Sequence, residues 1–150
     1  MRRFVLRGLL IAVVGTASGL LVNQVRGGLA LPQNAFLDTG DQEIEVKEAK
    51  ARLDHGALFL DARPAAFYDM SHIPGARPLP EDDFDRAYAR LEPLLRSRFD
   101  IIVYCSGFGC EASHDVAHRL KAKGIPAAVL QDGWPAWQEA GYPEKEGPES

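Results

Sequence analysis

The sequence is poor in the residues that build metal sites and disulfide frameworks. Its 150 residues include two cysteines, Cys105 and Cys110, and four histidines. The cysteines lie five positions apart without a pair of histidines beside them, a spacing that does not match a zinc site. The chain also lacks internal repeats and low-complexity stretches, which excludes a repeat array. Its composition is that of a globular protein of about one domain.

Acidic residues are missing from the start of the chain. Arg2, Arg3, Arg7 and Arg26 are the only charged residues among the first thirty. The remaining 120 residues carry thirteen basic and twenty-one acidic side chains, a net charge of −8. Because phosphate binding needs clustered lysine and arginine, this balance excludes nucleic acid as a partner and argues against an anionic lipid surface.

No apolar run of twenty residues is present, yet the N-terminal segment has the charge pattern of a membrane anchor. The uncharged run 8–22 would span about 22 Å as a helix, short of the roughly 30 Å of a bilayer core. Extending it to residues 4–22, with Arg7 snorkelling to the interface, makes the span adequate. We therefore expect residues 1–30 to anchor the chain. The following domain would lie on the extracytoplasmic side, because arginines precede the span.

A secretory signal peptide is the alternative interpretation of the same segment. The small residues at 28–30 offer a cleavage site, and cleavage would release a secreted or periplasmic protein. Both interpretations place the rest of the chain outside the cytoplasm. Residues 31–43 contain proline, asparagine, aspartate and glycine without periodicity, so we expect them to form a linker.

From residue 44 onward, short apolar runs alternate with helical patterns. The runs predict buried strands, since parallel strands covered on both faces are apolar throughout. Strands that alternate with helices predict an α/β fold with a parallel sheet, in which ligands bind beyond the carboxyl ends of the strands. Asp61 and Cys105 each follow such an end. The predicted strands are 57–60, 101–104 and 127–130, and the predicted helices are 46–53, 64–70, 82–95, 111–124 and 134–140, with Pro93 expected to kink or interrupt the third.

Cys105 has the most informative surroundings in the sequence. It follows the strand 101–104 and opens a loop with two glycines, Gly107 and Gly109, before the helical pattern that begins at Glu111. Glycines allow a tight turn in which backbone N–H groups face the sulfur, and the helix N-terminus adds positive potential. Both effects favour the thiolate, which is the nucleophilic form of cysteine. The local pattern alone fits a buried, inert cysteine equally well.

Three segments, in this order and spacing, resemble the rhodanese (sulfurtransferase) superfamily over roughly residues 44–143. The resemblance implies a parallel five-stranded sheet flanked by helices on both faces. Residues 144–150 are expected to form a flexible tail. The three segments are Leu60-Asp61-Ala62-Arg63 with the later His72-Ile73-Pro74-Gly75-Ala76, the strand 101–104 leading into Cys105, and Asp132-Gly133-Trp134-Pro135-Ala136-Trp137.

The resemblance also implies a function and a set of site residues. Cys105 would carry sulfur as a persulfide, taken from a small donor and passed to a thiol or cyanide acceptor, with no metal or cofactor. Asp61 and Arg63 would support the site, and a protein sulfur acceptor or a thiol reductant is a further class of partner. The expected substrate-binding residues are Ser106, Gly107, Phe108, Gly109, Cys110 and Glu111.

The loop departs from the family pattern at its end, where many members have arginine or lysine and this chain has Cys110 and Glu111. An arginine clamps a dianion and a glutamate repels one, so we expect no phosphatase activity and a poor response to thiosulfate. Cys110 has three interpretations: a disulfide with Cys105, a thiol that resolves a persulfide or sulfenate on Cys105, or a small packing residue. A non-enzymatic module for sulfur relay, redox sensing or partner binding is therefore the alternative function.

Overall fold

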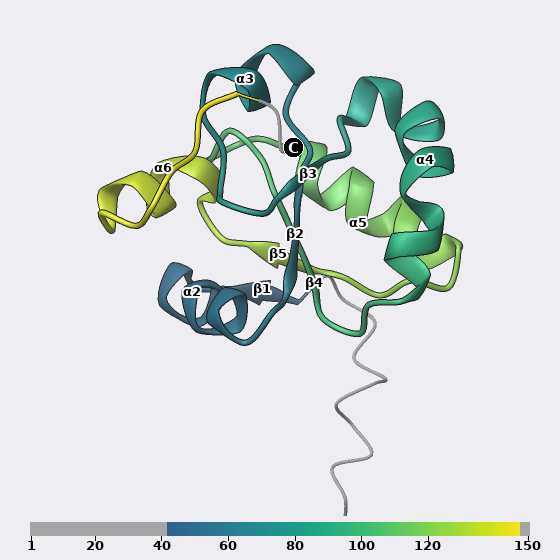
Figure 1. Ribbon diagram of the computed structural model, residues 1–150, viewed down its shortest axis with the longest axis horizontal. Coiled ribbons are helices and arrows are strands. Elements are labelled where there is room, and N and C mark those ends of the chain that lie inside the picture. Colours follow the sequence, from purple (N-terminus) through teal and green to yellow (C-terminus); the bar gives the residue numbers. More distant parts are fainter. Residues whose placement is uncertain (1–41, 148–150) are drawn as a thin grey trace, which may run out of the picture. The chain divides into compact units, whose positions relative to one another are not determined.

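The computed structural model describes residues 42–147, so the expected anchor at 1–30 and most of the expected linker at 31–43 lie outside the described residues. Five parallel strands form one sheet in the order β1-β5-β4-β2-β3 (Figure 1). No helix within 42–147 is long and apolar enough to cross a membrane. The strands are β1 (Glu43–Ile44), β2 (Leu58–Asp61), β3 (Arg77–Pro78), β4 (Ile101–Tyr104) and β5 (Ala128–Leu130); the helices are α2 (Val46–Asp54), α3 (Ala65–Met70), α4 (Phe84–Arg96), α5 (Ala112–Ala122) and α6 (Gly133–Glu139), with a short 3-10 helix at Glu81–Asp83.

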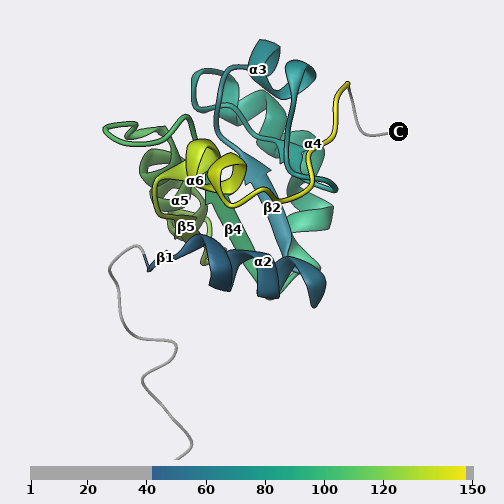
Figure 2. The same cartoon turned by 90° about the vertical axis from the view of Figure 1, so that its left-hand side faces the viewer.

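Helices cover both faces of the sheet, which explains why every residue of β2, β4 and β5 is buried. Alternate side chains of each strand enter different cores, because successive residues point to opposite faces. Leu60 and Val103 pack with residues of α4 and α5, whereas Phe59 and Tyr104 pack with residues of α2, α3 and α6. Figures 1 and 2 show α4 and α5 on one side of the strands and α2 and α6 on the other. The predicted fold class, a parallel five-stranded sheet flanked by helices, is therefore confirmed.

The structure differs from the sequence pattern in three of its elements, namely β1, β3 and α4. The two-residue strands β1 and β3 carry no apolar run, so the pattern alone does not reveal them; β1 is defined by pairing with β5, and β3 by pairing with β2. Helix α4 continues through Pro93 to Arg96, so the proline does not interrupt it. Pro93 and Ala89 both lie on the exposed side, where water can solvate the Ala89 carbonyl that lacks a helical N–H partner.

Residues 144–147, the first part of the expected flexible tail, are tied to the segment after α3. His72 and Lys145 exchange two backbone hydrogen bonds of 2.9 Å, and the Gly147 N–H donates to the carbonyl of Asp69 at 3.0 Å. The Ser71 hydroxyl donates to Glu144 at 2.8 Å. Backbone pairing across a large sequence separation leaves no periodic signal, which is why the sequence suggested a tail here.

Candidate active site

Cys105 lies immediately after β4, at the carboxyl edge of the sheet, and only 2% of it is exposed. It forms part of the wall of a cavity of about 400 Å³. Five of the six loop residues expected to bind substrate also line this cavity, whereas Ser106 is exposed and lies outside the lining. The five are Gly107, Phe108, Gly109, Cys110 and Glu111.

The hydrogen bonds of the Cys105 sulfur differ from those predicted. We expected loop N–H groups to face it, but its partners are the Ser113 hydroxyl and Cys110. The Ser113 hydroxyl donates to Sγ at 3.4 Å, and the Cys105 thiol donates to the Cys110 carbonyl oxygen at 3.2 Å. One loop N–H is unavailable because the loop closes on itself: Cys110 N–H donates to the Gly107 carbonyl at 3.0 Å. The sulfur is therefore stabilised by a hydroxyl from α5.

Sequence reasoning missed Ser113, although a signal for it exists. Ser113 lies in the first turn of α5, three residues after Cys110, and is 3% exposed. A buried hydroxyl needs a hydrogen-bond partner, and the Cys105 sulfur provides one. A serine on the inward face of the helix that follows a candidate nucleophile is thus a residue that a sequence search could flag.

Cys110 lies beside Cys105, whose thiol donates to the Cys110 carbonyl oxygen. Burial and a hydrogen bond with the Cys105 side chain raise the pKa of the Cys110 thiol, while the backbone N–H groups of Ser106 and Ala112 partly oppose this rise. The Ser106 N–H, one of those expected to face Cys105, thus acts on Cys110 instead. Both cysteines are free thiols in this structure, and Cys110 is partly buried against the core on the α4 and α5 side.

The cavity is lined by acidic side chains. Three of them contribute to its wall: Glu43 in the edge strand β1, Glu111 at the end of the loop and Asp132 after β5. His114 joins them, with Nε2 3.3 Å from a carboxylate oxygen of Glu43. Among the described residues, no lysine or arginine lines the cavity. The surroundings of the Cys105 thiol therefore carry negative charge.

The buried Arg63 and the arginines of α4 make their contacts outside the cavity lining. Arg63 is 4% exposed and forms an ion pair of 2.6 Å with Asp61, which is fully buried. Its guanidinium also donates to the Ser71 carbonyl at 2.7 Å and lies 4.6 Å from the centre of the Trp134 ring. The Tyr104 hydroxyl donates to Asp61 at 2.7 Å. Burial, together with the charge of this carboxylate, raises the pKa of Tyr104. Asp61 and Arg63 therefore form a buried network beneath the site.

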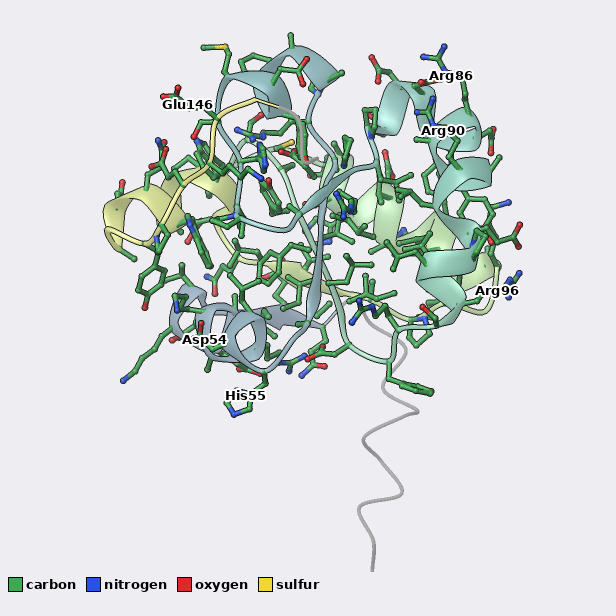
Figure 3. The ribbon with its side chains drawn as sticks, in the orientation of Figure 1. Asp54, His55, Arg86, Arg90, Arg96 and Glu146 are labelled. Atoms are coloured by element: carbon green, nitrogen blue, oxygen red, sulfur yellow. The ribbon has the colours of Figure 1, made fainter. Side chains whose placement is uncertain are left out.

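The arginines of α4 labelled in Figure 3, Arg86, Arg90 and Arg96, point outward from that helix.

The segment 132–135 packs directly on the cysteine loop. The Trp134 N–H donates to the Cys105 carbonyl at 2.8 Å. A Cβ at Gly133 would collide with that carbonyl oxygen and lie 2.9 Å from the nitrogen of Gly107. A Cβ at Gly107 would lie 2.9 Å from Cγ of Pro135. Glycine is thus required on both sides of this contact, which fixes the backbone of Cys105.

The structure thus places a cysteine at the carboxyl end of a central parallel strand of an α/β fold, followed by a tight loop and a helix. The profile of the rhodanese-like domain matches residues 45–140. The chain therefore belongs to the rhodanese-like domain family, as the three sequence segments indicated.

Individual relatives agree with this assignment. The chain is 33% identical, over 74% of its length, to the HTH-type transcriptional regulator Rv0324 of Mycobacterium tuberculosis, and it spans about half (48%) of that protein. The crystal structure of the thiosulfate sulfurtransferase from Pseudomonas aeruginosa is 30% identical with a TM-score of 0.58, over 71% of this chain and 20% of the other. The BH2092 protein from Bacillus halodurans shares the fold, with 21% identity and a TM-score of 0.63 over 71% and 77% of the two chains.

Proposed function

We propose that this protein is a sulfurtransferase that carries sulfane sulfur as a persulfide on Cys105. One observation carries the proposal: the Cys105 sulfur lies in the wall of a cavity, at the carboxyl edge of the sheet, and accepts a hydrogen bond from Ser113. A hydroxyl that donates to sulfur stabilises the thiolate more than the thiol, since bonds to a charged acceptor are stronger. A purely structural cysteine would need neither the cavity nor the donor.

The proposed reaction has two steps. The Cys105 thiolate attacks the outer sulfur of a donor persulfide, forms an S–S bond and releases the donor as a thiolate. A thiol or cyanide acceptor then attacks the outer sulfur on Cys105 and restores the thiolate. The Ser113 hydroxyl is placed to donate to Cys105 each time negative charge returns to its sulfur.

The acidic lining favours a donor whose reacting end carries little charge. Thiosulfate concentrates two negative charges on a few atoms, and Glu43, Glu111 and Asp132 would repel it. Steady-state assays should compare thiosulfate with glutathione persulfide. We expect kcat/KM to be at least about tenfold higher for the persulfide, a difference of about 1.4 kcal/mol. A strong preference for thiosulfate would contradict this part of the proposal.

Non-enzymatic sulfur relay or sensing is the second candidate, and two observations favour it. The relative from Mycobacterium tuberculosis is a transcriptional regulator, and the described lining lacks a cation to bind an anionic donor. The two functions differ in turnover. An enzyme passes many sulfur atoms per chain from donor to cyanide, and the substitution Cys105→Ala abolishes this cycling. A relay or sensor module takes up at most one sulfur per chain, which intact mass would detect as a gain of about 32 Da at Cys105.

We further propose that residues 4–22 anchor the protein, with the rhodanese-like domain on the extracytoplasmic side. The arginines before the uncharged run support this orientation. Mass spectrometry of the N-terminus of protein isolated from membranes tests the proposal. An intact N-terminus in the membrane fraction supports an anchor, whereas a new N-terminus near residue 30 identifies a cleaved signal peptide.

A further inference from the structure

Cys110 is the second thiol in the described cavity wall, and the proposed transfer does not use it. It lies at the end of the loop that Cys105 opens, and both cysteines line the same cavity. The loop between them contains two glycines with positive φ, Gly107 at 113° and Gly109 at 75°, which turn the chain back on itself. The Cys110 carbonyl oxygen accordingly lies 3.2 Å from the Cys105 sulfur. A second thiol is thus in place beside the sulfur that would carry the persulfide.

We propose that Cys110 resolves the Cys105 persulfide, releasing hydrosulfide and leaving a disulfide between the two cysteines. This step rests on the proposed persulfide of Cys105. It adds a second activity to sulfur transfer, namely the reduction of sulfane sulfur to sulfide when no acceptor arrives.

The geometry favours attack on the inner sulfur of the persulfide. The backbone of Cys110 already touches the Cys105 sulfur, which becomes that inner sulfur, because the Cys110 carbonyl oxygen accepts its hydrogen bond at 3.2 Å; the outer sulfur would extend further from Cys105. Attack on the inner sulfur forms the Cys105–Cys110 bond and breaks the bond to the outer sulfur. Thiol–disulfide exchange follows the same course, with a thiolate attacking one sulfur and the other leaving.

The step balances without an external oxidant. A Cys105 persulfide anion and a Cys110 thiol give one disulfide and one hydrosulfide ion, with the proton passing from Cys110 to the departing sulfur. The two cysteines lose two electrons relative to their thiols, and the sulfane sulfur gains them. A dithiol reductant then regenerates both thiols by exchange.

The surroundings of Cys110 suit a thiol that waits until sulfur is loaded. Burial raises the pKa of the Cys110 thiol, which favours its protonated form, and the backbone N–H groups of Ser106 and Ala112 partly oppose this rise. Its partial burial also limits access for bulky external thiols.

The test follows the mass of the full chain after one loading with glutathione persulfide and rapid removal of the donor. The wild-type chain should gain about 32 Da and then lose that sulfur, ending about 2 Da below its reduced mass with one equivalent of sulfide released. Peptide mapping should place the new disulfide between Cys105 and Cys110. The variant Cys110→Ser should load but keep its added sulfur at least about ten times longer, and Cys105→Ser should gain no sulfur at the loop.

Each result bears on a different claim. Equal persulfide lifetimes in the wild type and Cys110→Ser, with no disulfide in the wild type, would overturn the resolving role while leaving sulfur transfer intact. No mass gain at Cys105 in either chain would instead refute the persulfide carrier. The mapped disulfide in the wild type does not depend on any variant, so it decides the question even where Cys110→Ser folds poorly.

Discussion

The contact between Gly133 and the cysteine loop yields the sharpest prediction. Gly133 has φ of 52°, and a Cβ there would collide with the Cys105 carbonyl oxygen. The left-handed backbone costs a non-glycine residue about 1–2 kcal/mol. Relief of the collision must move the backbone and weaken the 2.8 Å bond from the Trp134 N–H to that carbonyl, at about 1–2 kcal/mol more. We therefore expect Gly133→Ala to lower the free energy of unfolding by about 2–4 kcal/mol.

Gly124→Ala is the matched control for this prediction. Gly124 also has positive φ, 78°, but no atom lies within 4 Å of the position that its Cβ would occupy. Gly124→Ala should lower the free energy of unfolding, measured in urea, by about 1–2 kcal/mol, the cost of the left-handed backbone alone. Sulfur loading at Cys105 should slow at least tenfold in Gly133→Ala and stay near the wild-type rate in Gly124→Ala, because misplacing a reacting atom is costly. If the free energies of unfolding of Gly133→Ala and Gly124→Ala lie within about 0.5 kcal/mol of each other, the claim that close packing on the loop requires Gly133 is refuted.

Three further predictions concern the sulfur and the charge of the site. Ser113→Ala removes a bond worth about 1 kcal/mol, so alkylation of Cys105 by iodoacetamide at pH 7 should slow about fivefold. The hydroxyl of Ser106 touches no sulfur, so Ser106→Ala should change that rate less than twofold. Similar losses of rate in both variants would count against the role of Ser113. Because burial and the hydrogen bond with Cys105 raise the pKa of Cys110, the folded chain keeps a proton that the unfolded chain loses above a pH of about 8.5. The free energy of unfolding should therefore fall as the pH rises from 8 to 9.5, and Cys110→Ala should flatten this fall in urea titrations; an unchanged slope would show that other groups cause it. Glu111→Arg replaces repulsion of a dianion by attraction, so kcat/KM for thiosulfate should rise about tenfold, and no rise would argue against control of donor choice by charge.

Local sequence determined the interior strands, the helices and the candidate nucleophile. The apolar runs of β2, β4 and β5 are buried on both faces, so their composition alone predicts them. Cys105 could be singled out because it follows one of these strands and precedes a glycine-bearing loop and a helix. The absence of a loop arginine was equally visible, and it led to the expected weakness toward thiosulfate.

Tertiary structure decided what surrounds that nucleophile. Ser113 reaches the sulfur only because α5 packs against β4, and Cys110 meets Cys105 only because the loop closes through its own hydrogen bond. Glu43 and Asp132 join the acidic lining from opposite ends of the domain, where parallel pairing of β1 with β5 brings their segments together. Periodicity and composition record how a residue relates to its neighbours in the chain. Contacts across ninety residues depend on the packing of the whole sheet, and only the folded chain contains them.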